Sequence, residues 1–377
     1  MKVKSIKGKT AVEIKLAIET VLEDGFKPTL AVVFISVESE LDAVRKILSE
    51  RGILIFGSSS GSEFVDSEVE SSSLVILLLD MDRTKFSTRL FESGSSTTTS
   101  IAEQIGKVGM NTFRKPAFII VSAGLRTDGD EVVAGIEKAC GMGTTLFGGL
   151  AADNFKFERT FVFTNDALTD NGLVALIFDE EKVNVSGIAV GGWRPIGMDR
   201  TITHSEGNIV YTIDNEPAMD FILRYAGIKN MQAENMIDFF IASNFQVQLQ
   251  RENKHPVMRS PMQANKMDRS VAFSGGLPQG SKIRLCLLPG FEVIEEALGQ
   301  FAIYKNAQPD ADAMLMFSCA GRQLSLGPYV SNEIEGVKNI WNIPMVGFFC
   351  YGEIGRMASG NIEFHGMTCS LTLIKEK

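Results

Sequence analysis

The sequence predicts an α/β protein, with mixed sheets flanked by helices and built from repeated strand-helix-strand units. Three runs are continuously apolar rather than alternating, as strands buried on both faces are, at residues 30–36, 117–122 and 313–319. A helical pattern follows each run, and then a shorter apolar strand reaches Gly57, Gly148 or Gly347. Such units place helices on the outer faces of sheets, and two sheets back to back, an αββα layering, fit the pattern.

Polar residues follow each of these three glycines. In chain order they are Ser58, Ser59, Ser60, Glu63, Asp153, Asn154 and Glu353. One such junction is ordinary glycine behaviour at a turn. A glycine after a strand also lets the backbone approach a ligand, and α/β proteins place their sites at strand ends. Three copies therefore predict a ligand site where the strand ends meet.

Composition restricts the class of protein. The 377 residues, 45% of them hydrophobic, can bury large cores and predict two domains or, as the alternative, three. The net charge of -9 argues against general binding to nucleic acid or to anionic membranes. No apolar run reaches membrane-spanning length, and no apolar signal region follows the basic N-terminus. The five cysteines are widely spaced, which predicts a reduced, cytoplasmic protein without a disulfide frame or zinc site.

Capping residues predict the helix starts in the first half of the chain. Thr10 and Glu13 form a capping box. Ser39 and Ser100 are expected to cap the next two helices, the second of them after a Ser/Thr-rich loop. The other elements expected in this half are a helix at 131–140, a strand at 183–190 and a hairpin of 200–204 with 208–213.

A domain boundary is expected next to Asp214, which separates domains 1–213 and 214–377. Asp214 is predicted to cap a helix with Pro217 in its first turn. Residues 251–269 are polar and rich in Lys and Arg, which predicts a solvated surface loop. The other elements expected here are a strand at 245–249, a hairpin of 271–273 with 283–288, and a helix at 291–304 before the third unit.

Several motifs resemble those of the FIST family. Similar to its C-terminal domain are Glu333 and the stretches SCAGR (318–322), GFFCYGEIG (347–355) and FHGMT (364–368). Similar to its N-terminal domain are GSSSGSE (57–63) and FGGLAAD (147–153). The resemblance covers nearly the whole chain from Leu30 onward, so the two expected domains are FIST N-terminal-like and FIST C-terminal-like.

This resemblance implies an intracellular sensory module that binds a small ligand such as an amino acid in signal transduction. Cys319, Arg322, Tyr351 and Glu353 join the polar residues after the glycines as implied ligand contacts. No kinase, cyclase or DNA-binding segment is recognisable outside the two domains, so the expected partner is a signalling protein acting in trans. Certain members sense nitric oxide through haem, which is one alternative. We expect neither cofactor nor metal, because the three histidines lack metal-ligand spacing.

Glu353 and Arg322 carry the chemical hypothesis. A carboxylate buried without a partner is costly, so Glu353 is exposed, paired, or able to receive a cationic group. A salt bridge to Arg322 is one interpretation. In the other, both line one pocket, where the guanidinium binds a carboxylate and Glu353 binds an ammonium group, so that together they recognise a zwitterion. The serines at 58–60 either add anion contacts or form only a polar turn.

Two further classes of function stay open. Cys319 near Arg322 fits a lowered-pKa nucleophile in a hydrolase, but a cysteine that ends an apolar strand is usually a small core residue. No base motif accompanies it, so we expect that the protein is not an enzyme. A chain that binds no metabolite would instead be a protein-interaction scaffold.

Overall fold

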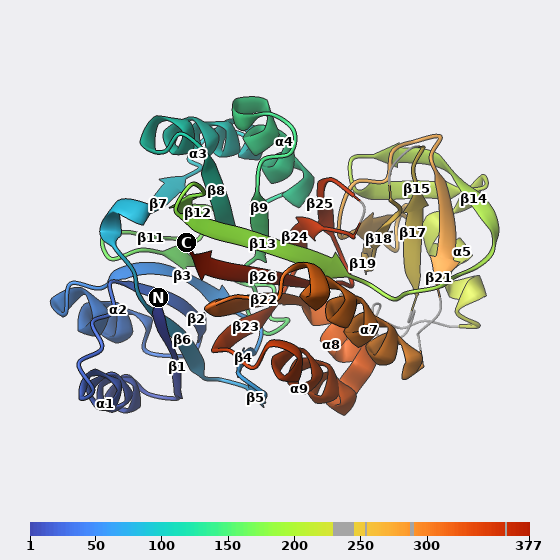
Figure 1. Ribbon diagram of the computed structural model, residues 1–377. Coiled ribbons are helices and arrows are strands. Elements are labelled where there is room, and N and C mark those ends of the chain that lie inside the picture. The colour runs from blue at the N-terminus through green and yellow to red at the C-terminus, as the bar shows by residue number, and fades with distance from the viewer. Residues whose placement is uncertain (229–244, 253–254, 287–289, 359) are drawn as a thin grey trace.

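The computed structural model describes residues 1–228, 245–252, 255–286, 290–358 and 360–377. These residues form three mixed six-stranded sheets and a fourth sheet of eight antiparallel strands. Helices lie against the outer faces of the mixed sheets (Figure 1). The predicted α/β class, with helix-flanked mixed sheets, is confirmed. No helix in the described part of the chain is long and apolar enough to cross a bilayer.

The three mixed sheets have the same topology, because each is built around one copy of the repeated unit. The first unit comprises β1 (Lys2–Gly8), α1 (Ala11–Leu22), β2 (Leu30–Ser36), α2 (Leu41–Glu50), β3 (Leu54–Ser60) and β6 (Leu74–Asp80). The second comprises β7 (Phe86–Glu92), α3 (Thr98–Thr112), β8 (Pro116–Ser122), α4 (Gly129–Cys140), β9 (Leu146–Leu150) and β12 (Gly172–Asp179). The third comprises β13 (Val183–Val190), α7 (Glu292–Ala307), β22 (Ala313–Cys319), α8 (Ala320–Leu326), α9 (Val330–Trp341), β23 (Met345–Cys350) and β26 (Cys369–Glu376).

Short strands are exchanged between the units in a ring. From the first unit, β4 (Glu63–Val65) and β5 (Glu68–Glu70) extend the third unit's sheet at β23. From the third, β24 (Glu353–Arg356) and β25 (Ile362–His365) extend the second unit's sheet at β9. From the second, β10 (Val162–Phe163) and β11 (Leu168–Thr169) extend the first unit's sheet at β3.

One backbone hydrogen bond per unit closes this ring of strands. The three are Gly61 N to Phe349 O at 3.1 Å, Tyr351 N to Leu150 O at 3.1 Å, and Ala152 N to Ser59 O at 3.3 Å. The repeated glycines of the three units are Gly57, Gly148 and Gly347. Each donor lies four residues after the repeated glycine of its own unit, and each acceptor lies two residues after that of the neighbouring unit in the ring. Because every unit completes the sheet of another, no unit has its full sheet alone.

The exchanged strands explain two of the repeated glycines. A Cβ atom on Gly57 would lie 2.2 Å from the ring of Phe163, and one on Gly347 would lie 2.2 Å from the ring of Phe64. Both phenylalanines belong to exchanged strands and sit opposite these glycines in the register. At these two positions the missing side chain makes room for an aromatic ring, not for a ligand.

The inner faces of all three mixed sheets share one core. Phe34 of the first unit packs between Phe317 and Phe348 of the third, with ring centroids 6.0 and 4.5 Å away. Three further cores lie between each sheet and its helices. β2, β8 and β22 are therefore buried on both faces, as their continuous apolar runs predict. The sheets surround one core as a set of three instead of lying two back to back.

The fourth sheet is inserted between β13 and α7 and has its own core. It lies at the right of Figure 1. Its elements are β14 (Pro195–Glu206), β15 (Ile209–Ile213), β16 (Glu216–Pro217), α5 (Ala218–Tyr225), β17 (Gln246–Gln250), β18 (Val257–Arg259), β19 (Pro261–Ala264), β20 (Val271–Phe273) and β21 (Lys282–Cys286). The expected boundary between residues 213 and 214 falls between β15 and β16.

The strand pairing of the fourth sheet differs in part from the prediction. β14 and β15 form the expected hairpin, with Gly207 in its turn at φ 59°. The hairpin of 271–273 with 283–288 is wrong, because β20 pairs with β15 and β19 whereas β21 pairs with β14 and β17. Residues 287 and 288 lie outside the described part of the chain. The polar stretch 251–269 contains β18 and β19, so the prediction of a surface loop is wrong there. Its polar side chains can be buried in strands because they find partners far away in the chain, as Arg259 does with Asp130.

Several predicted caps also differ. Thr10 caps α1 as expected. Ser39 does not cap α2, which begins after Glu40 without a side-chain cap. Thr97, not Ser100, caps α3, because its hydroxyl accepts the Ser100 amide. Asp214 does not cap α5, because its carboxylate accepts the Thr201 amide at 2.8 Å in the adjoining turn.

Candidate functional site

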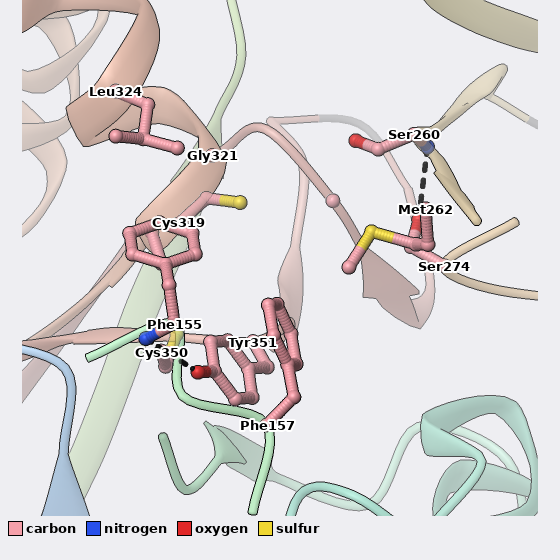
Figure 2. A pocket seen from close by; sticks show the side chains of 12 residues that line it. Phe155, Phe157, Ser260, Met262, Ser274, Cys319, Gly321, Leu324, Cys350 and Tyr351 are labelled. Carbon is pink, nitrogen blue, oxygen red and sulfur yellow. Dashed lines mark hydrogen bonds between the residues drawn. The ribbon is translucent and has the colours of Figure 1, made fainter. Parts of the chain in front are cut away.

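A pocket lies where the ends of β22 and β23 face the fourth sheet (Figure 2). Its volume is about 40 Å³. The lining residues are Phe155, Phe157, Ser260, Met262, Ser274, Cys319, Ala320, Gly321, Leu324, Cys350, Tyr351 and Gly366. Aromatic, aliphatic and sulfur-containing side chains dominate this set, and none of the described lining residues is charged.

An insertion in the second unit builds one wall of this pocket. In the first and third units the exchanged strand starts two residues after the ring amide, but in the second unit residues 153–161 intervene. This insertion carries Phe155 and Phe157, and the Phe157 ring stacks on Tyr351 with centroids 5.0 Å apart and planes 15° apart. Both phenylalanines have left-handed backbones, with φ of 61° and 52°, a strained conformation that marks many binding sites.

Asp153 holds the insertion in this shape. Its carboxylate accepts the backbone amides of Phe157, Glu158 and Arg159 at 2.8 to 3.0 Å, together with the hydroxyl of Tyr351. The Tyr351 oxygen in turn accepts the Phe155 amide at 2.8 Å. Asp153 is therefore buried one layer behind Tyr351 instead of lining the pocket. Its neighbour Asn154 is exposed and does not line the pocket either.

Glu353 lies behind the other wall, fully buried. It accepts hydrogen bonds from the Cys350 thiol at 3.2 Å and from the amide and hydroxyl of Thr368 at 3.2 and 2.8 Å. Burial raises the pKa of Glu353 to about 8. At neutral pH the side chain is therefore mostly protonated, which explains how it is buried without a cation.

Glu63 repeats this arrangement in the first unit. It accepts hydrogen bonds from the hydroxyls of Ser60 and Ser73, the latter at 2.7 Å, and burial raises its pKa to about 7. Ser73 directly precedes β6 and Thr368 directly precedes β26, the same position of each unit. Ser73 and Thr368 were not identified from the sequence, although an alignment of the repeated units would have placed both at this position. Glu63 does not line the pocket.

Arg322 does not pair with Glu353. Its Nε lies 3.0 and 3.2 Å from the two carboxylate oxygens of Glu333 on α9, and its Nη1 donates to the carbonyls of Gly191 and Met367 at 2.6 and 3.2 Å. Both side chains of the Arg322–Glu333 pair are fully buried. The interpretation in which Arg322 and Glu353 form a salt bridge is wrong, because Glu333 on α9 satisfies the guanidinium.

Two of the three serines after Gly57 are hydrogen-bonded to other residues of the protein. Ser59 donates to the carbonyl of Ala152 at 2.9 Å and accepts the Phe161 amide at 2.9 Å, which secures the exchanged strand. Ser60 binds Glu63, and the Ser58 hydroxyl is buried without a hydrogen-bond partner. None of them lines the pocket.

The thiols of Cys319 and Cys350 line the pocket from adjacent positions of β22 and β23. Burial, with the carboxyl of Glu353 as a second cause, raises the pKa of Cys319 to about 12 and that of Cys350 well above its usual value. Both are protonated thiols at neutral pH, so this geometry does not supply the thiolate that a cysteine nucleophile needs.

Histidine contributes nothing to the pocket lining. His365 is buried with its Nε2 3.2 Å from the Gly355 carbonyl, and burial lowers its pKa to about 3. His204 stacks on Tyr211 in the fourth sheet. Within the described ranges no group of three or more His, Cys, Asp or Glu side chains is placed to hold a metal ion. A pocket of about 40 Å³ admits roughly three water molecules and is too small for a porphyrin.

Of the residues that the sequence indicated, Cys319 and Tyr351 line the pocket. Glu353 and Asp153 each lie behind a lining side chain to which they are hydrogen-bonded. The sequence alone did not reveal the pocket residues that the insertion and the fourth sheet contribute. The run of aromatic and polar residues at 153–159 was a visible signal for the insertion, whereas the fourth-sheet residues carry none.

Comparisons with known proteins find two family profiles along the chain. Residues 29–216 match the profile of the FIST N domain, and residues 218–356 match that of the FIST C domain. Two uncharacterized proteins from strains of Mycobacterium tuberculosis are each 21% identical to this chain over 244 residues. The matched region covers 61% of this chain and 61% of each relative.

Proposed function

The chain belongs to the FIST family, and we propose that it is a cytoplasmic sensory protein whose aromatic pocket binds a small amine, either an amino acid or a related metabolite. FIST domains are associated with sensory roles in signal transduction. Its five unpaired cysteines support the cytoplasmic location. The receiver of the signal would be a separate protein acting in trans.

The observation that carries this proposal is the electrostatic character of the pocket. Phe155, Phe157 and Tyr351 present aromatic rings, no basic side chain lines the described pocket, and the carboxyl groups of Asp153 and Glu353 lie directly behind. Aromatic faces attract ammonium groups, and the Asp153 carboxylate behind Tyr351 strengthens that attraction. Glu353 adds to it once the bound ammonium group has favoured its ionised form. The pocket therefore suits the cationic end of a ligand better than an anionic end.

The pocket, at about 40 Å³, has room only for the ammonium end of such a ligand, so the rest of an amino acid would extend out of the pocket past the fourth sheet. Arg322 is occupied by Glu333, so the zwitterion would not be held by Arg322 and Glu353. Instead Ser260 and Ser274 face the thiols across the pocket, as Figure 2 shows. A ligand that contacts both sides would join the ring of strand ends to the fourth sheet, and this provides a way to report occupancy.

Glu353 makes the proposal measurable. A bound ammonium group favours the ionised carboxylate, so it should lower the pKa of Glu353 from about 8 and release a proton at neutral pH. Calorimetry of the same ligand in buffers with different ionisation enthalpies measures that proton. Glu353→Gln should bind without proton release.

A thermal-shift screen of amines and amino acids, each paired with its deaminated analogue, is the direct test. A ligand at about a hundred times its Kd adds roughly 2.7 kcal/mol to the free energy of unfolding, which is resolvable as a rise in Tm. Phe157→Ala should abolish the shift, whereas Phe291→Ala, on an exposed aromatic pair with Tyr329, should retain it. If no amine shifts Tm at millimolar concentration, the proposal fails and a protein-interaction scaffold becomes the better interpretation.

A further inference from the structure

A second cavity lies where the sheets of the second and third units meet. Its volume is about 360 Å³, within the range of small-metabolite sites. β13, the end of β24 and the end of α7 enclose it together with the segments around Thr145 and Glu180. It shares no lining residue with the aromatic pocket.

Arg356 at the end of β24 gives this cavity its charge. The Nε atom of Arg356 is buried without a hydrogen-bond partner, and no carboxylate of the described chain forms an ion pair with its guanidinium. Arg322, by contrast, has its charge balanced by Glu333. A guanidinium left without an anion in a half-buried site is costly, unless a ligand supplies the anion.

The remaining polar groups of the cavity leave that positive charge uncompensated. The carboxylate of Glu180 also lines it, but this group is bound by Lys115 at 3.2 Å and by the Thr145 hydroxyl at 2.8 Å. Gln308 uses its side-chain oxygen to accept from Asn184 and Ser186, at 3.3 and 3.4 Å. The side-chain amide nitrogen of Gln308 therefore adds a donor without a partner among the described residues.

We propose that this cavity is a second ligand site, which takes a small organic carboxylate. The planar guanidinium of Arg356 matches the two oxygens of a carboxylate, and the amide of Gln308 supplies a further donor. Phe147, Ile188 and Ile362 provide apolar walls for the body of the ligand. With one uncompensated positive charge, the cavity suits a monoanion.

This site and the aromatic pocket are linked by one strand. Arg356 lies three residues after Glu353 on β24, the strand that the third unit lends to the second. A carboxylate on Arg356 would hold the end of β24 against β13, so it would stabilise the junction between two units. The inference does not depend on what the aromatic pocket binds.

Calorimetric titration of the full chain with acetate, lactate and benzoate tests the proposal, with lactamide and benzamide as neutral counterparts and inorganic phosphate as a competing anion. At least one carboxylate should bind saturably in the millimolar range or tighter. Arg356→Gln should weaken it at least tenfold, Arg356→Lys should weaken it less, and Arg126→Gln, at an exposed position, should leave it unchanged.

Two readouts separate binding from folding and from the aromatic pocket. Because Arg356 lacks an anion in the unliganded protein, Arg356→Gln should have a Tm no lower than the wild type. Tyr351→Phe, which changes the aromatic pocket, should keep carboxylate binding. The proposal is overturned if no carboxylate binds, if the amides bind equally, if phosphate binds and carboxylates do not, or if Arg356→Gln binds with unchanged affinity.

Discussion

Replacing Glu353 with glutamine should change how the stability of the protein depends on pH. Burial raises the pKa of Glu353 from 4.5 to about 8, so the folded protein keeps this proton over a range in which the unfolded chain has lost it. Below pH 4.5 both states are protonated and the group has no effect. As pH rises from there toward about 8, the free energy of unfolding falls by about 1.4 kcal/mol per pH unit.

The expected size of this effect follows from the full burial of the side chain. Between about pH 5 and about pH 8 the wild type should lose about 4 kcal/mol relative to Glu353→Gln. Glu63, with a pKa of about 7, contributes in the same direction. His365, with a pKa of about 3, contributes in the opposite direction, because its stabilisation is lost as pH falls below 6.5. Both groups are present in the two proteins, so they cancel in the difference.

Urea unfolding followed by circular dichroism at several pH values measures this difference. Glu335→Gln, at an exposed position of α9, is the matched control and should run parallel to the wild type. A difference between wild type and Glu353→Gln that stays constant from pH 5 to pH 8 would refute the reasoning. It would mean that Glu353 is already ionised in the folded protein.

Two further predictions concern the packing that positions the site. Arg322→Met and Glu333→Gln should each lower the free energy of unfolding by about 3 to 5 kcal/mol, because each leaves a buried charge without its partner. The double variant Arg322→Met/Glu333→Leu should lower it by less than either single change. Equal or additive losses, measured by urea unfolding, would contradict the buried ion pair. Gly57→Ala should cost about 1 to 3 kcal/mol through its clash with Phe163, and should cost less in a Phe163→Leu background. Gly299→Ala, which meets nothing within 4 Å, is the control, and a similar loss there would refute the explanation.

The structure also shows which parts of the candidate site were predictable. Cys319 and Tyr351 were indicated because they belong to the stretches 318–322 and 347–355, which resemble motifs of the FIST C-terminal domain. The partner of Arg322 was not predictable, because Glu353 and Glu333 are both acidic and nearby in the chain, and only the packing of α8 against α9 decides between them. Ser260 and Ser274 come from the inserted sheet, and their sequence carries no sign that they face Cys319.

The sequence by itself determined the repeated unit, its helix-flanked strands and the burial of β2, β8 and β22, because apolar periodicity reports directly on the surroundings of a strand. The tertiary structure alone decided that each unit lends its short strands to another, and that three sheets enclose one core. It also decided that Gly57 and Gly347 accommodate Phe163 and Phe64. These outcomes depend on contacts between segments far apart in the chain, and the energy of such contacts has no local signature in the sequence.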